Sequence, residues 1–176
     1  QALAFEVLTP EHGVAPGLQA RLCALLARAA GHDGMAGGQA VDLASTGRAL
    51  AEAELRRMHE RKTGALLRAS VLMGAACGRT DAQQWQALTD YGDAVGLAFQ
   101  VVDDILDVTQ ASDVLGKTAG KDQDANKPTY VSLLGLAAAR EHAQALREEA
   151  LAALAPFGQR GRRLGEIADW ITRRDR

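Results

Sequence analysis

Apolar residues recur at helical spacing along nearly the whole of this 176-residue chain. Residues three and four apart share one face of a helix, whereas strands alternate with a period of two, and no such alternation persists here. The pattern therefore predicts an all-α bundle forming a single domain over residues 1–176. The expected helices cover residues 16–30, 34–46, 49–77, about 80–108, 137–154 and 160–173.

Capping residues and helix breakers suggest where these helices begin and end. Pro16 suits a first helical turn, and Gly31 is a typical stop. Thr80 followed by Gln83 has the spacing of a capping box, in which two side chains satisfy the free backbone groups at a helix start. We therefore expect one helix to end at Gly31 and another to begin at Thr80.

Two further segments are less regular. Residues 49–77 read as one long or kinked helix with weak points at Gly64 and Gly74. Residues 110–127 are polar and rich in Gly and Lys, so they are predicted to form a loop, after which Pro128 can open the next helix.

Composition and charge exclude several classes of protein. Lys and Arg total 20 and Asp and Glu total 22, so the chain lacks the basic excess of a nucleic-acid-binding surface. No apolar run reaches the roughly 18 residues that span a membrane. Cys23 and Cys77 form no paired motif, which favours a reducing, cytoplasmic location over a disulfide framework.

The start of the chain is unusual. It opens on Gln1, inside the apolar run of residues 2–8. We expect from this that an N-terminal portion precedes the sequence.

Three aspartates between residues 96 and 107 carry the clearest chemical signal. On a helix Phe99, Asp103 and Asp107 share one stripe, and Gln100 and Asp104 share the next. Carboxylates on an apolar helix repel one another and are costly unless compensated, and Mg²⁺ takes one or two carboxylates together with phosphate oxygens. The pattern favours a Mg²⁺ site, with Mn²⁺ as another metal of this type. The alternative is a solvated acidic helix face.

Cations for a phosphate ligand lie in two segments. Lys62 precedes Gly64, whose slim turn lets a ligand or another helix approach closely. Lys117, Lys121 and Lys127 lie in the Gly-containing loop after the aspartates, and such a loop can close over phosphate. The alternatives are an ordinary surface lysine and a mobile hydrophilic connection.

The glycine-rich segment 34–43 contains Gln39 and Asp42, which are three residues apart and share a helix face. Interior glycines cost a helix roughly 1 kcal/mol each relative to Ala, so they indicate either ligand access or a close helix crossing. Both interpretations remain open at this point.

Taken together and in this order, these segments resemble the trans-isoprenyl diphosphate synthases. The matching stretches are GMAGGQAVDL, ERKTGALL, GLAFQVVDDILD and GKTAGKDQDANKPTYVSLLGL. The overall look is nearest to the bacterial farnesyl diphosphate synthases, matched in their C-terminal part. The resemblance implies antiparallel helices around a deep cavity, usually in a homodimer. It also implies two Asp-rich motifs that bind Mg²⁺ and the diphosphate of an allylic substrate.

The resemblance also suggests roles for individual residues. Asp103, Asp104 and Asp107 match the second Asp-rich motif and would bind metal. Lys62 matches a lysine that holds the allylic diphosphate, and Thr63 matches a hydroxyl that steadies the developing cation.

Further matches concern the cavity and the loop. Gln100 matches a polar residue near the reacting end, and Phe99 a ring on the cavity side. Lys117 and, less closely, Lys127 match diphosphate-binding lysines. Gln39 and Asp42 match a pair lining the cavity. The residues expected to take part in catalysis are Lys62, Thr63, Gln100, Asp103 and Lys117.

The implied activity is the Mg²⁺-dependent condensation of isopentenyl diphosphate with dimethylallyl or geranyl diphosphate to give farnesyl diphosphate. The first Asp-rich motif and the N-terminal basic cluster of the family are absent from these residues, so we expect residues 1–176 alone to be inactive. Alternatives are a geranylgeranyl or other short-chain product, or a non-catalytic partner subunit. A terpene cyclase fits less well because the KTG segment and the GKxxGKD loop belong to the elongating synthases.

Overall fold

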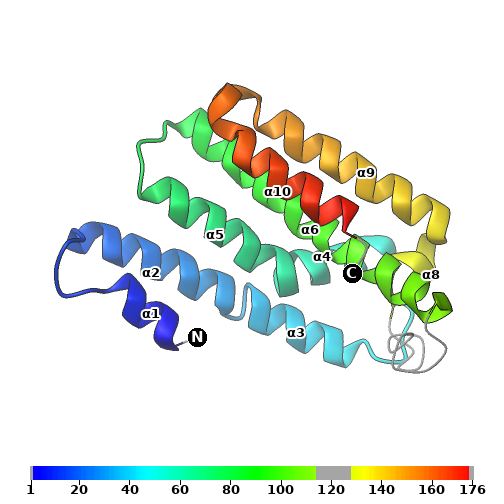
Figure 1. Ribbon diagram of the computed structural model, residues 1–176. Helices are drawn as coiled ribbons and strands as arrows, with labels where there is room; N and C mark the ends of the chain where they lie inside the picture. The colour runs from blue at the N-terminus through cyan, green and yellow to red at the C-terminus, as the bar shows by residue number, and fades with distance from the viewer. Residues whose placement is uncertain (1, 114–127, 175–176) are drawn as a thin grey trace.

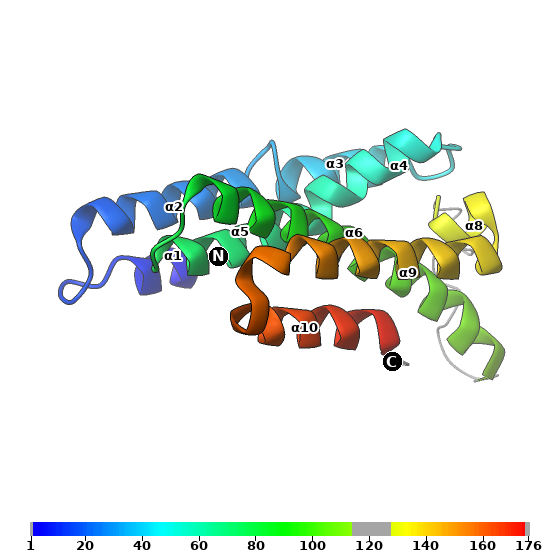
Figure 2. The ribbon, with the colours of Figure 1, turned by 90° about the horizontal axis from the view of Figure 1, so that it is seen from above.

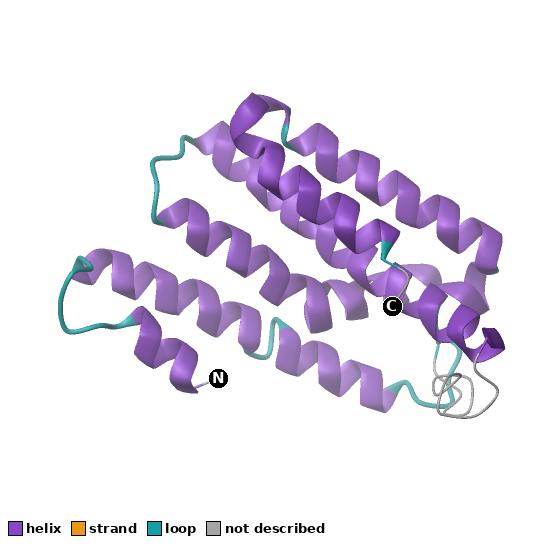
Figure 3. Ribbon diagram, in the orientation of Figure 1, coloured by secondary structure: helices purple, strands orange, loops and turns teal. Residues whose placement is uncertain are grey.

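The computed structural model of the protein describes residues 2–113 and 128–174. The described residues form helices and contain no strand, which confirms the all-α prediction (Figure 3). The α-helices are α1 (Ala2–Leu8), α2 (Pro16–Ala30), α3 (Met35–Ala44), α4 (Glu52–His59), α5 (Ala65–Ala76), α6 (Ala82–Asp113), α8 (Tyr130–Leu134), α9 (Leu136–Ala153) and α10 (Arg162–Arg173). A π-helix, η1 (Glu60–Gly64), joins α4 to α5, and a 3₁₀ segment, η2 (Ala155–Gly161), joins α9 to α10.

The long helix α6 runs through the middle of the fold. It packs against α5 and η1 on one side and against α9 and α10 on another (Figures 1 and 2). Helices α2 and α3 lie beyond α5 and η1, so that α3 contacts η1 directly. The residues of η1 therefore lie between α3 and α6.

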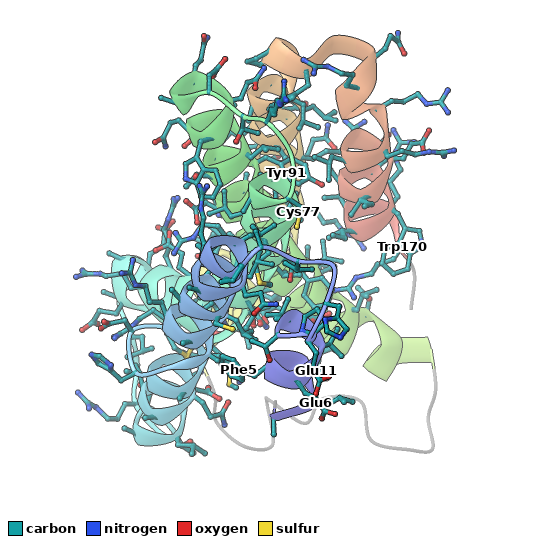
Figure 4. All side chains as sticks on the ribbon, turned by 90° about the vertical axis from the view of Figure 1, so that its left-hand side faces the viewer. Phe5, Glu6, Glu11, Cys77, Tyr91 and Trp170 are labelled. Carbon is teal, nitrogen blue, oxygen red and sulfur yellow. The ribbon has the colours of Figure 1, made fainter. Side chains whose placement is uncertain are left out.

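Two apolar clusters fix the position of α6. The first joins α4, α6, α8 and α9 through fully buried side chains that include Leu55, Val101 and Leu146. The second lies toward the other end of α6, where the Tyr91 hydroxyl donates a hydrogen bond of 2.7 Å to the Leu164 carbonyl (Figure 4). Together they anchor both ends of the helix that carries the aspartates.

The predicted start of α6 is wrong by one residue. The capping box is formed by Asp81 and Gln84: Asp81 Oδ1 accepts from the Gln84 N–H at 2.7 Å, and Gln84 Oε1 accepts from the Asp81 N–H at 3.3 Å. Thr80 and Gln83 have the same spacing. Asp is a stronger N-cap than Thr, and this explains the shift.

The segment predicted as one long or kinked helix, residues 49–77, departs from regular α-helical geometry at only one of its two expected weak points. The π-helix η1 ends at Gly64, whereas Gly74 lies inside the regular helix α5. One wide turn changes the direction in which the side chains around it point, and such turns are frequent at functional sites. Lys62 and Thr63 lie within η1.

Helix α6 extends beyond its predicted end near Val108, to Asp113. The first residues of the expected loop, 110–113, are thus helical, and residues 114–127 lie outside the described residues. Pro128 does not open the next helix, because α8 begins at Tyr130 with the Thr129 side chain accepting from the Ser132 N–H at 3.0 Å. The threonine satisfies a free N–H there, and proline has no side-chain acceptor to do so.

Several large apolar side chains remain exposed on the outer helices. Leu3 and Val7 of α1 are 67% and 68% exposed, and Trp170 of α10 is 65% exposed (Figure 4). None of the helices in the described part of the chain has the length and hydropathy needed to cross a membrane.

Candidate active site

Glycines bring three backbones together where η1 lies between α3 and α6. A Cβ placed on Gly38 of α3 would lie 2.3 Å from the Lys62 backbone nitrogen. A Cβ on Gly96 of α6 would lie 2.6 Å from the Gly64 Cα. Both distances are far below an ordinary contact of about 3.5–4.0 Å, so only glycine fits at either position without movement of the backbone. These crossings confirm that the slim turn at Gly64 admits another helix.

Lys62 forms an ion pair with Asp42 across the α3–η1 crossing. Its Nζ lies 2.7 Å from Asp42 Oδ2. The Asp42 side chain is 7% exposed and that of Lys62 is 30% exposed, so Lys62 is not an ordinary surface lysine. A buried carboxylate beside an ammonium group fixes the direction of that group. Gln39 lies half-buried on the same helix, one turn before Asp42.

Thr63 and Gln100 meet across the crossing of η1 and α6. The Thr63 hydroxyl lies 3.1 Å from Gln100 Oε1, and Gln100 Nε2 donates to Asp104 Oδ1 at 3.2 Å. The second Asp104 oxygen, Oδ2, accepts from the backbone N–H of Tyr130 at 2.8 Å. Because the carboxylate only accepts, the Gln100 amide group must face it, and the Gln100 oxygen then faces the Thr63 hydroxyl. Thr63 is therefore the donor in this pair.

The three aspartates do not occupy equivalent positions. Asp104 is 3% exposed and is held by Gln100 and by the N-terminus of α8, so it links two helices. Asp103 and Asp107 lie one helical turn apart, and both are partly exposed. The predicted division of the motif into two stripes is confirmed. Metal binding by each aspartate stays a prediction.

Arg174, which follows α10, forms an ion pair with Asp103. Its guanidinium Nη2 donates to Asp103 Oδ1 and, at 3.1 Å, to the Phe99 carbonyl oxygen. The guanidinium carbon lies 4.0 Å from the centroid of the Phe99 ring. Burial raises the pKa of Asp103 above its usual value, and the Arg174 charge opposes this rise. Phe99 thus lies on the same stripe of α6 as Asp103, as predicted, and its ring contacts an arginine.

Sequence reasoning missed the contribution of Arg174, because nothing in the run of charges at residues 173–176 marks one arginine as buried. It also missed His59, which is 5% exposed beside Tyr130, with ring centroids 5.8 Å apart. Burial first, and the Lys62 charge second, lower the pKa of His59 to about 4, although Asp42 opposes the shift. His59 is therefore neutral at pH 7 and adds no positive charge beside Lys62.

Comparison with known proteins places this site in a family. The family model described as "Polyprenyl synthetase" matches residues 1–155. The chain belongs to the polyprenyl synthetase family. This membership confirms the resemblance drawn from the sequence motifs.

Relatives of this polyprenyl synthetase chain are named for two different products. It is 43% identical over 178 residues to a farnesyl diphosphate synthase of Haemophilus influenzae, covering 99% of this chain and 60% of that protein. It is 44% identical over 177 residues to a chloroplastic geranylgeranyl pyrophosphate synthase of Catharanthus roseus, covering 99% of this chain and 50% of that protein. The chain thus spans about 50–60% of the length of these relatives.

A solved structure shares the fold. The geranyltransferase of Helicobacter pylori, crystallised with magnesium and isoprenyl diphosphate, superposes with a TM-score of 0.80 at 34% identity, and the match covers 97% of this chain and 55% of that one.

The exposed part of the aspartate stripe suits a hard cation. Asp103 keeps 42% of its side chain exposed, and Asp107 offers a second carboxylate one turn away. Mg²⁺ prefers one or two carboxylates and completes its shell with water and phosphate oxygens, which this donor set allows. Within residues 2–113 and 128–174 no group of three or more His, Cys, Asp or Glu side chains could hold a metal by itself. Lys117, Lys121 and Lys127 lie outside the described residues.

Proposed function

We propose that this polyprenyl synthetase chain forms one wall of the active site of a Mg²⁺-dependent trans-prenyltransferase. The reaction would join isopentenyl diphosphate to dimethylallyl or geranyl diphosphate and give farnesyl diphosphate. The observation that carries the proposal is the contact of η1 with α6, where Thr63 meets Gln100; Lys62 directly precedes Thr63 on η1, and Asp103 follows Gln100 on α6. These residues could bind a diphosphate and face the carbon that it leaves.

Lys62 would hold the allylic diphosphate. Charge-assisted hydrogen bonds to phosphate are worth roughly 1.5–3 kcal/mol each. Asp42 already directs the ammonium group at a distance of 2.7 Å, so little side-chain freedom is lost when an anion binds. The His59 ring, neutral and stacked on Tyr130, packs nearby without competing for that anion.

Asp103 and Asp107 would hold Mg²⁺, which acts as a Lewis acid that draws charge from the leaving diphosphate. Departure of the diphosphate breaks the C1–O bond and leaves an allylic cation. The double bond of isopentenyl diphosphate then forms the new carbon–carbon bond, and a proton is lost to the departing diphosphate.

The direction of the Thr63 hydrogen bond would assist this ionisation. The Thr63 hydrogen is directed at Gln100, so the hydroxyl oxygen presents its lone pairs to the remaining directions. A fixed dipole of this orientation stabilises positive charge without rearrangement. Gln100 is fixed in turn by Asp104, which gives the buried aspartate a positioning role.

The test uses the protein as encoded by its gene, incubated with isopentenyl and geranyl diphosphates and Mg²⁺. Asp103→Ala should lower turnover about 10²–10³-fold or more with unchanged circular dichroism, because a transition-state charge contact is lost. Asp90→Ala is the matched control, since Asp90 is exposed on the same helix and, among the described residues, hydrogen-bonds only to the Gln86 side chain. Near-normal activity of Asp103→Ala would reject the proposal.

Chain length of the product is tested in the same assay. A fifteen-carbon product supports the proposed function, and a twenty-carbon product supports the geranylgeranyl alternative suggested by the Catharanthus relative. We also propose a cytoplasmic homodimer. The free thiols of Cys23 and Cys77 suit a reducing compartment.

A further inference from the structure

Arg174 is a cation bound to the carboxylate on which the proposed metal site depends. Its side chain is 11% exposed, whereas that of Asp103 is 42% exposed. Its only carboxylate partner in the described part of the chain is Asp103. A largely buried guanidinium needs a counter-ion, because an unpaired buried charge is costly. Asp103 is thus the counter-ion of Arg174.

The contacts of the Arg174 guanidinium do not use all of its N–H donors. Nη2 serves both Asp103 and the Phe99 carbonyl, Nη1 makes no hydrogen bond within the described residues, and Nε is buried without a partner there. Stacking on the Phe99 ring holds the planar group beside the aspartate stripe without using its N–H donors. Free donors in a fixed fork are suited to a phosphate oxygen.

We infer that Arg174 is a resident counter-ion that makes metal binding at Asp103 depend on diphosphate. The inference rests on the proposed function. A divalent cation that arrives alone meets a carboxylate already neutralised by a guanidinium, and the two cations repel one another. When diphosphate arrives with the metal, it supplies negative charge for both cations and accepts from the free donors of Arg174.

Two measurements on the protein as encoded by its gene test this inference. The first is the affinity for Mn²⁺ alone, followed by electron paramagnetic resonance. The second is the affinity for inorganic pyrophosphate in excess Mg²⁺, followed by calorimetry. Arg174→Gln removes the charge, and Arg174→Lys keeps it. Arg173→Gln is the matched control, because Arg173 is exposed and forms no ion pair in the described part of the chain.

The two affinities should change in opposite directions. Arg174→Gln should bind Mn²⁺ alone about three- to tenfold more tightly, the scale of a partly buried ion pair, and should bind magnesium pyrophosphate several-fold more weakly. Arg174→Lys should stay nearer to wild type in both measurements, and Arg173→Gln should match wild type within about twofold. Circular dichroism checks that each variant is folded.

Every other result overturns the inference. If Arg174→Gln weakens both affinities, Arg174 orients Asp103 for the metal and does not oppose it. If neither affinity changes, the pair has no part in binding. If the wild-type protein binds neither Mn²⁺ alone nor inorganic pyrophosphate in excess Mg²⁺, the metal site of the proposed function fails as well, which distinguishes that failure from a failure of the Arg174 inference alone.

Discussion

Gly96→Ala tests whether the closeness of η1 and α6 builds the site. The added methyl group would lie 2.6 Å from the Gly64 Cα, about 1 Å inside an ordinary carbon–carbon contact. The obstacle is backbone, so no side chain can rotate away and the two helices must separate. Overpacking of this kind costs about 1–3 kcal/mol, and the better helix propensity of Ala returns about 1 kcal/mol.

Gly74→Ala is the matched control. Gly74 lies inside α5 with no atom within 4 Å of an added Cβ, so this change should gain helix propensity at no steric cost. Gly96→Ala should therefore be about 1–3 kcal/mol less stable than Gly74→Ala in equilibrium urea unfolding followed by circular dichroism. The same separation moves Gln100 away from Thr63, so turnover of Gly96→Ala should fall at least about tenfold, because small misplacements in a site are costly.

The outcome that would refute this reasoning is equal stabilisation of both variants with full activity in Gly96→Ala. That result would mean that the backbones at Gly64 and Gly96 are not in close contact.

Three further predictions concern binding, pH and the limits of the chain. Lys62→Ala should weaken binding of the allylic diphosphate more than binding of isopentenyl diphosphate in calorimetric titrations. Equal effects on the two affinities would mean that Lys62 has no specific ligand. The pKa of His59 is about 4 in the fold against 6.5 unfolded, so the unfolded state binds the extra proton. Stability should thus fall as pH drops from 6.5 toward 4, by about 3 kcal/mol in all, and urea unfolding of His59→Leu should lack this component. Residues 1–176 expressed alone should form no farnesyl diphosphate from isopentenyl and geranyl diphosphates with Mg²⁺, and clear product would show that one Asp-rich helix suffices.

The sequence by itself determined the helical fold and the identity of the polar residues at the site. Apolar spacing is a local property, so α2 begins at Pro16 and ends before Gly31 as predicted. The stripe of Asp103 and Asp107 follows from the geometry of one helix. The glycines of residues 34–38 indicated either ligand access or a close crossing, and the sequence could not decide between them.

Only the tertiary structure decided which of these residues meet. The Lys62–Asp42 and Thr63–Gln100 pairs join residues 20 and 37 positions apart, and the glycine crossings that bring them together depend on how whole helices pack. Arg174 reaches Asp103 from 71 positions away, and no local pattern marks it. Burial also depends on all neighbours at once. For that reason one aspartate of the motif became a buried link to α8, while its neighbour stayed partly exposed beside an arginine.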